Sequence, residues 1–155
     1  MLKFYDYKVT NSLEVPGEVC LCYHLSECQN RCVGCFSPEL WESSDINLSD
    51  VYTDILLAYS KRITCVCFLG EGMNTEYEHT EFIYLCQEIH SLGFNTCLYC
   101  GRDCNIEDWM YCFDYIKIGS YKQSLGDLSE RTTNQRLYRK TKYDYEDITY
   151  LFWED

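Results

Sequence analysis

The feature that most constrains this chain is a group of three cysteines on one short polar segment near its amino end. Cys28, Cys32 and Cys35 stand in a C-x3-C-x2-C spacing. Three thiolates from one loop can hold three irons of a [4Fe–4S] cube, and the fourth iron then has no protein ligand and is open to a small molecule. The spacing therefore predicts an iron–sulfur cluster with one substrate-binding corner.

Zinc is the alternative that the same residues leave open. C-x2-C and C-x3-C spacings are also found in zinc sites, and His24 stands four residues before Cys28, where it could serve as a fourth ligand. A zinc-bound interaction module without catalysis is therefore a competing interpretation of this segment.

A second cysteine group, Cys97, Cys100 and Cys104, has the reverse spacing. A second metal site there is conceivable, but Cys97 and Cys100 fall within a predicted strand, where residues three apart point to opposite faces. We therefore interpret these cysteines as buried or incidental thiols.

Length and charge limit the classes of protein and of partner. The chain has 155 residues, so we expect a single domain over 1–155. It carries 13 basic and 25 acidic side chains, with a formal net charge of −12. This charge repels phosphate backbones and anionic headgroups, so neither nucleic acid nor a membrane is expected as a partner.

The cysteine count bears on the compartment. Twelve cysteines would indicate disulfides in a small secreted protein. Residues 1–10, however, lack the basic start and apolar stretch of a secretion signal, and no apolar run is long enough to span a membrane. We therefore expect a reducing, cytoplasmic compartment, in which scattered cysteines act as small buried apolar groups.

Apolar patterns predict alternating strands and helices. Strands are expected at Val19–Leu25, 63–69, 95–100 and 114–118, and helices at Leu48–Tyr59, after the capping box Thr75-Glu76-Tyr77-Glu78, and at 106–112. The tail, 143–155, is expected to add an edge strand or a docking segment. Strands that alternate with helices imply parallel pairing, and ligands then bind beyond the carboxyl ends of the strands. The cysteine segment, Gly70-Glu71-Gly72, Gly101-Arg102 and Gly119 should converge there.

The surroundings of the third cysteine resemble a known family. Gly34 precedes Cys35, and Phe36-Ser37-Pro38-Glu39-Leu40-Trp41 follows it. This is similar to the anaerobic ribonucleoside-triphosphate reductase activating proteins of the radical S-adenosylmethionine superfamily, whose motif reads C-x3-C-x-G-C, an aromatic residue or His, then N-P-x-x-W. Ser37 stands where the family has Asn.

Two further segments carry the same resemblance, which covers roughly 14–140. Tyr99-Cys100-Gly101-Arg102 is similar to the family's Y-[ST]-G-R, and 114–139 contains Gly119-Ser120-Tyr121, Leu125-Gly126 and Thr132-Thr133-Asn134-Gln135-Arg136. Asn134, Gln135 and Arg136 match a signature to which we assign structural support or contact with a partner.

The resemblance implies an α/β fold, specifically a partial open (β/α) barrel of mostly parallel strands. It implies two cofactors, a [4Fe–4S] cluster and S-adenosyl-L-methionine, which the reduced cluster cleaves to a 5′-deoxyadenosyl radical. The expected activity is an activase that forms a glycyl radical on the large subunit of the anaerobic ribonucleoside-triphosphate reductase. An electron donor such as flavodoxin is implied as a second partner.

The resemblance also implies a set of site residues. Cys28, Cys32 and Cys35 are the expected metal ligands, and Phe36, Gly70, Glu71 and Arg102 are expected to bind the cofactor. The family usually has G-G-[DE] where this chain has Leu69-Gly70-Glu71, so an ordinary turn remains the alternative for Glu71, and a solvated loop arginine for Arg102. We assign no catalytic acid or base, because the cofactor carries the radical chemistry.

Two functional alternatives remain within the same chemistry. The chain could activate another glycyl-radical enzyme or modify a small molecule. It could also be a degenerate member of the family that binds the cluster but not S-adenosylmethionine, because of the altered Leu69-Gly70-Glu71 segment.

Overall fold

A computed structural model describes residues 1–27 and 44–154 of the chain. The expected cluster ligands Cys28, Cys32 and Cys35, and the neighbouring Phe36, lie outside the described residues.

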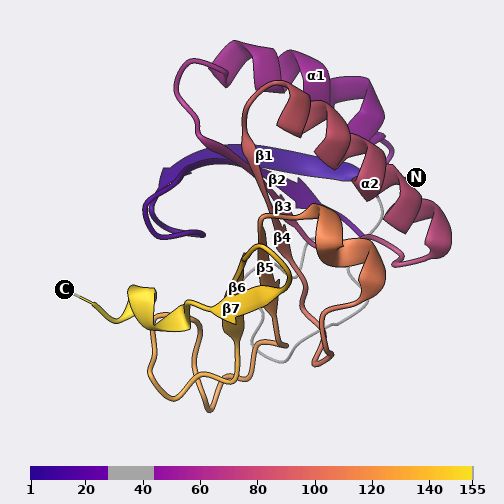
Figure 1. Cartoon of the computed structure of the whole chain (residues 1–155). Helices are drawn as coiled ribbons and strands as arrows, with labels where there is room; N and C mark the ends of the chain where they lie inside the picture. The colour runs from indigo at the N-terminus through magenta and orange to yellow at the C-terminus, as the bar shows by residue number, and fades with distance from the viewer. Residues whose placement is uncertain (28–43, 155) are drawn as a thin grey trace.

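The fold is α/β and is built on a seven-stranded sheet within the described residues (Figure 1). The strands follow one another across the sheet in chain order: β1 (Phe4–Asn11), β2 (Val19–Leu25), β3 (Cys65–Leu69), β4 (Asn95–Tyr99), β5 (Tyr115–Ile118), β6 (Arg136–Lys140) and β7 (Tyr145–Asp147). The four central strands, β2 to β5, pair in parallel, whereas β1 at one edge and β6 and β7 at the other pair antiparallel. The prediction of an α/β fold is confirmed.

The sheet is mixed, so the expectation of mostly parallel strands is correct only for its centre. The connections explain the difference. A crossover between parallel strands needs a dozen or more residues and usually a helix, whereas a short turn returns the chain antiparallel. β1 reaches β2 through the short turn 12–18, and the segment 119–135 between β5 and β6 contains no helix among its described residues.

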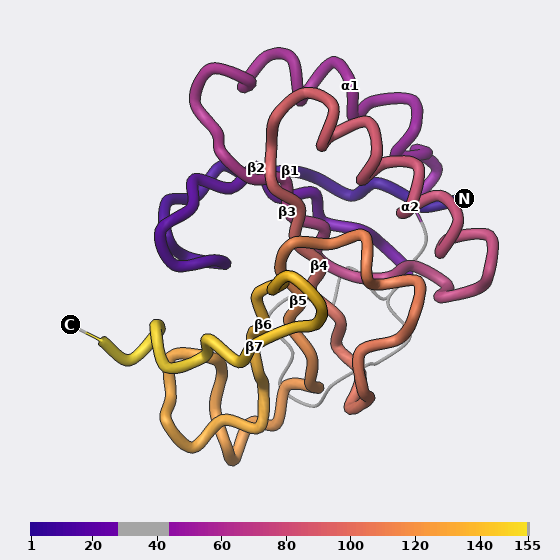
Figure 2. Tube along the Cα trace, viewed as in Figure 1, coloured from indigo at the N-terminus to yellow at the C-terminus, as the bar shows by residue number. Residues whose placement is uncertain are grey.

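Helices lie on one face of the parallel strands (Figures 1 and 2). Along the chain, α1 (Leu48–Tyr59) comes after β2 and before β3. α2 (Glu76–Ser91) joins β3 to β4, and the short 3₁₀ helix η2 (Asp108–Cys112) joins β4 to β5. Right-handed crossovers place successive helices on the same side. The predicted bounds of β2 and α1 are confirmed to the residue.

The capping box predicted at the start of α2 is also present. The backbone N–H of Thr75 donates to the Glu78 carboxylate at 3.1 Å, and the Thr75 hydroxyl donates to the same oxygen at 2.5 Å. This contact satisfies backbone donors at the helix N-terminus. It fixes where the helix begins, directly after the loop that carries Glu71.

The core between helices and sheet is centred on aromatic rings. Phe68, fully buried on β3, stacks on Tyr23 with ring centroids 5.8 Å apart and meets Phe82 of α2 edge to face at 5.5 Å. Phe113 completes the group at 6.3 Å from Phe68. These contacts join β2, β3, α2 and the segment after η2 into one packed layer.

The opposite face of the sheet is lined by cysteines. Cys20 lies beside Cys65, Cys22 beside Cys67, and Cys67 beside Cys97, and all five are fully buried. Val15, Leu137 and Ile148 belong to the same buried cluster. Burial raises the pKa of Cys97 to about 12 and that of Cys67 above its ordinary range, so these thiols stay protonated. The prediction that these cysteines fill the core is confirmed.

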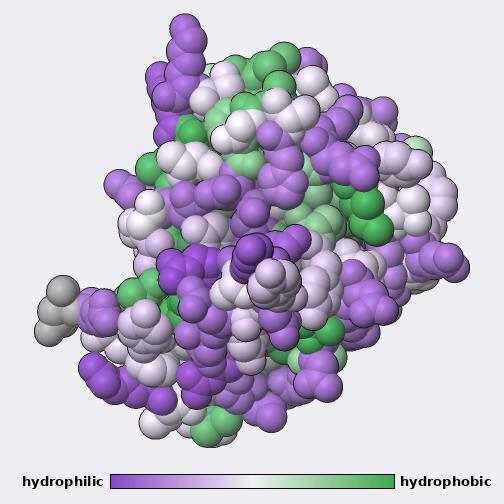
Figure 3. Space-filling model, viewed as in Figure 1, coloured by the Kyte–Doolittle hydropathy of each residue, from purple (hydrophilic) through white to green (hydrophobic). Residues whose placement is uncertain are grey.

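The C-terminal tail adds β7 as an edge strand, one of the two alternatives expected for it, and then the 3₁₀ helix η3 (Thr149–Phe152). The face seen in Figure 3 is mainly hydrophilic, with hydrophobic residues in small scattered groups. Among the described residues, no helix combines the length and the apolar character needed to cross a bilayer.

β1 was not predicted. It is an edge strand whose side chains are mostly exposed, so it lacks a continuous apolar signature.

We expect Phe68→Ala to destabilise the protein by about 4 kcal/mol, because it leaves a cavity among three packed aromatic rings. Tyr84→Ala is the control, since Tyr84 is 66% exposed and its loss should change the free energy of unfolding by less than about 0.5 kcal/mol. Urea denaturation of both variants under anaerobic conditions measures the difference. Similar midpoints would contradict the assigned core.

Candidate functional site

Three loops meet at the carboxyl ends of the parallel strands. The backbone N–H of Gly70, after β3, donates to the Tyr99 carbonyl at 3.1 Å, and the N–H of Cys100, after β4, donates to the Lys117 carbonyl at 2.7 Å. The N–H of Gly119, after β5, donates to the Arg102 carbonyl at 3.0 Å. These bonds continue the sheet ladder into the loops. The predicted convergence is confirmed for these three loops.

Both ends of the cysteine segment reach the same edge of the sheet. A Cβ atom on Gly70 would lie 3.5 Å from the carbonyl oxygen of Leu25, the last residue of β2. Gly70 has a φ of +119°, a conformation that favours glycine. At the other end, the N–H of Ser44 donates to the Ser26 hydroxyl at 3.2 Å. Residues 26 and 44, which flank the segment, are therefore neighbours beside Gly70.

Glu71 and Arg102 form a bidentate ion pair across two of these loops. Arg102 Nε donates to Glu71 Oε1 at 3.0 Å, and an Nη atom donates to Oε2 at 2.9 Å. The Glu71 side chain is 5% exposed and that of Arg102 is 27% exposed. The planar guanidinium matches the two carboxylate oxygens, which gives this pair a defined geometry. Two of the four residues predicted to bind the cofactor are thus brought together.

A second carboxylate, Glu107, binds the other side of the same guanidinium. Arg102 donates to Glu107 at 2.6 and 3.3 Å, and the indole N–H of Trp109 donates to it at 2.9 Å. The imidazole of His79 stacks on Trp109, with 4.1 Å between ring centroids. Sequence reasoning missed Glu107, Trp109 and His79, because they come from η2 and α2 and no short motif joins them to Arg102.

The charges of this group act on one another. The hydrogen bonds that Arg102 donates to Glu71 and Glu107 raise the pKa of Arg102, and the bond to Glu107 lowers the pKa of that carboxylate. Burial lowers the pKa of His79, which favours its neutral form. By formal charge, the two carboxylates and the one guanidinium of this group leave one negative charge. Such a group is suited to holding a charged, cationic ligand rather than to moving protons.

The second cysteine group divides between the two faces of the sheet. Cys97 lies in the cluster of cysteines, whereas Cys100 belongs to the aromatic core, with its sulfur 3.9 Å from that of Cys104. His24, the alternative zinc ligand, pairs through Nδ1 with Asp6 on β1. In the part of the chain that the structure describes, no three His, Cys, Asp or Glu side chains are placed to hold a metal ion.

Asn134 and Gln135 support the loop after β5. The Asn134 side-chain amide donates to the Ser120 carbonyl at 3.0 Å, and Asp103 accepts from both the N–H and the hydroxyl of Ser120. A Cβ atom on Gly119 would lie 3.0 Å from Gln135 Cα, so the two segments pack in direct contact. This arrangement favours structural support, one of the two roles expected for the signature.

We expect Glu71→Gln to destabilise the protein by about 2 kcal/mol, because it replaces two charge-assisted hydrogen bonds at a buried carboxylate. Glu76→Gln, an exposed acid in the first turn of α2, is the control with the same chemical change. Chemical denaturation measures both. Equal stability of the two variants would mean that the pair contributes nothing measurable.

Stability at acid pH should depend on Glu107. Its pKa is lower in the folded state than its ordinary value of 4.5, so its ionised form contributes stability that is complete above that value. The contribution is lost as the pH falls through the lower, folded pKa. Glu107→Gln should therefore flatten the decline of melting temperature between about pH 5 and pH 3. The exposed neighbour Asp108 provides the control Asp108→Asn, and identical profiles for both variants would contradict the assignment.

Comparison with known proteins adds no relative. No protein-family model, no characterised protein and no solved structure matches the chain significantly.

Proposed function

We propose that this protein is a radical S-adenosylmethionine activase, which generates a glycyl radical on the large subunit of the anaerobic ribonucleoside-triphosphate reductase. One observation carries the proposal beyond the motif. The loops after β3, β4 and β5 meet beside both ends of the segment that contains Cys28, Cys32 and Cys35. A cofactor held by those cysteines would therefore adjoin Gly70, Glu71 and Arg102.

The arrangement of the sheet is compatible with a partial open barrel. Four parallel strands carry helices on one face, and the antiparallel strands at the edges complete the sheet. The other face is covered by a small buried cluster and the C-terminal segment, without a second layer of helices among the described residues. Ligands of such sheets bind beyond the carboxyl ends of the strands.

The proposed roles follow from the chemistry of the side chains. Cys28, Cys32 and Cys35 would hold a [4Fe–4S] cluster, which supplies the electron for reductive cleavage of S-adenosylmethionine. Gly70 lets the loop after β3 approach the end of β2, next to the cysteine segment, and Phe36 would pack against the cluster or the adenine. In this proposal, the described residues orient the cofactor and exclude water.

Glu71 and Arg102 are suited to the methionine moiety of the cofactor. A carboxylate attracts its amino group, and a guanidinium attracts its carboxylate. S-adenosylmethionine carries a sulfonium and an ammonium against one carboxylate, so its net charge is opposite to that of the Glu71–Arg102–Glu107 group. In this proposal the ligand exchanges one carboxylate partner of Arg102 for its own, while Glu107 keeps the guanidinium in place.

The proposed partner completes the site. A glycine-bearing loop of the reductase large subunit would approach the converging loops and shield the radical. A reduced donor such as flavodoxin would supply the electron. The acidic surface of the chain supports neither nucleic acid nor a membrane as a partner.

The experiment that tests this proposal is anaerobic reconstitution with iron and sulfide, followed by electron paramagnetic resonance of the reduced protein. We expect a cubane signal that changes shape when S-adenosylmethionine is added, and a glycyl radical after the reductase subunit is added. Cys28→Ala should abolish all three observations. Cys104→Ala, which changes a cysteine of the described site loop, is the matched control and should retain the cluster.

Two outcomes would contradict the proposal in different ways. A tetrahedral zinc centre, or equal radical yield from Cys28→Ala, would exclude the cluster assignment. A normal cluster signal that S-adenosylmethionine leaves unchanged would indicate a chain that binds the cluster but has lost the cofactor. Glu71→Gln separates cofactor binding from cluster assembly, because it should retain the cubane signal and weaken its response to S-adenosylmethionine.

A further inference from the structure

The two helices that cover the sheet carry only one sign of formal charge at neutral pH. Within their described bounds, α1 and α2 contain no Lys or Arg. They do contain several carboxylates: Asp50, Asp54, Glu76, Glu78, Glu81 and Glu88. Surface helices usually mix both signs, since opposite charges one turn apart stabilise the helix. The absence of cations on both helices gives this layer a negative potential.

A groove runs between these two helices. Its larger part, about 870 Å³, lies between the first half of α1 and most of α2 and includes Tyr52, Glu81 and Leu85 in its lining. A smaller hollow of about 170 Å³ continues it toward the end of α2 and shares Tyr52 and Glu88 with it. Together they form a channel along the seam between the helices, which we call the helix groove.

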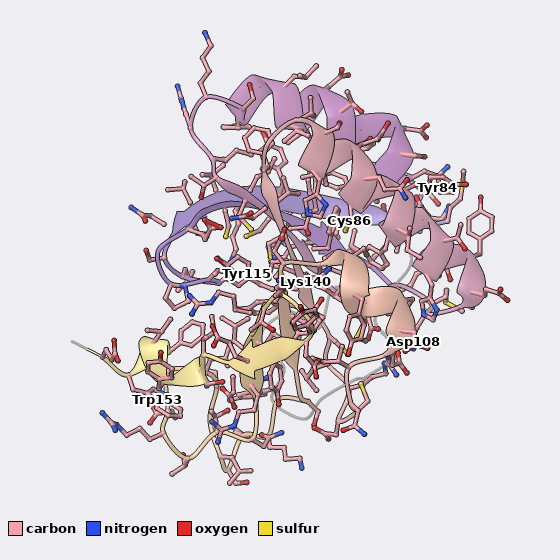
Figure 4. The ribbon with its side chains drawn as sticks, in the orientation of Figure 1. Tyr84, Cys86, Asp108, Tyr115, Lys140 and Trp153 are labelled. Carbon is pink, nitrogen blue, oxygen red and sulfur yellow. The ribbon has the colours of Figure 1, made fainter. Side chains whose placement is uncertain are left out.

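Large aromatic and aliphatic side chains that are exposed to solvent border the helix groove. Tyr77 is 59% exposed and Tyr84 66%, while Leu57 and Leu92 are 59% and 54% exposed at its far end. Tyr84 projects from the outer side of α2, whereas Cys86, two residues later, faces the sheet (Figure 4). Large exposed side chains gathered around a hollow mark interaction sites more often than scattered ones do.

We propose that the helix groove docks a basic amphipathic helix of a partner protein. Lys and Arg on the rim of such a helix would face Glu76 and Glu88, and an apolar side chain would enter beside Tyr84. A helix laid in a groove between two helices is a recurrent mode of recognition. The charge of the groove decides the chemistry of the occupant, because its charged side chains are the carboxylates of Glu76, Glu81 and Glu88. The amino group of Met1 also lies in the lining, but it is paired with Glu78 at 3.1 Å.

The same charges disfavour the other occupants. A second copy docked through the same face would bring carboxylates against carboxylates, which costs free energy.

The inference does not depend on the proposed function, because it rests on helix residues outside the candidate site. The groove begins at the same edge of the sheet as that site, since α1 follows Ser44 closely and α2 follows the Glu71 loop. A docked helix would thus place its protein next to the converging loops.

Two labelled synthetic peptides of about the length of α2 test the proposal: a helical Leu/Lys peptide and its Leu/Glu counterpart. We expect the basic peptide to raise fluorescence anisotropy on binding and the acidic one to remain free. Glu76→Lys with Glu88→Lys should weaken binding about tenfold. Glu130→Lys with Glu154→Lys, exposed acids outside the groove, changes the net charge equally and should weaken binding less than about twofold.

A second pair of variants separates the groove from general attraction to an acidic protein. Tyr84→Ala should weaken binding about fivefold, because it removes an apolar contact without changing charge. Tyr143→Ala, at an 85% exposed tyrosine in the turn before β7, should have no effect. Equal effects of the two charge pairs, or of the two tyrosines, would overturn the proposal. So would sedimentation showing a dimer that the Glu76 and Glu88 substitutions dissociate, since the occupant would then be a second copy.

Discussion

The parallel pairing of β2, β3, β4 and β5 is the constraint on which the candidate site depends. Parallel strands end at the same edge, so their following loops must lie side by side. The hydrogen bonds that Gly70, Cys100 and Gly119 donate to the neighbouring strand or loop extend this order beyond the strand ends. The aromatic contacts of Phe68 hold the strands against α2, and this packing fixes the start of that helix relative to the Glu71 loop.

The Glu71–Arg102 pair places two charged groups at this edge of the sheet. A carboxylate 5% exposed would be costly without a partner, and Arg102 supplies both of its hydrogen bonds. Glu107 then shares the guanidinium, and Trp109 orients Glu107. Each charged group is thus held in place by its neighbour.

The two faces of the sheet are covered by different kinds of side chain. Buried thiols fill one side of the sheet, aromatic rings fill the other, and the helices outside the rings present carboxylates to solvent. The buried thiols of the cysteine cluster are inaccessible to solvent, so the proposed redox chemistry does not involve them. The acidic helix layer is a separate surface, next to the candidate site but independent of its residues.

The sequence by itself determined the central strands, both α-helices and the loops that meet at their ends, because these elements have apolar periodicity and local signals such as the capping box at Thr75. It also determined that Cys97 and Cys100 separate, since that follows from the pleat of one strand. Only the tertiary structure decided that Arg102 pairs with Glu71 and is shared with Glu107, that β1 and β6 run antiparallel, and that the helices leave an acidic groove. These features depend on contacts between residues distant in sequence, whose side chains carry no local pattern and are placed by the packing of the whole sheet.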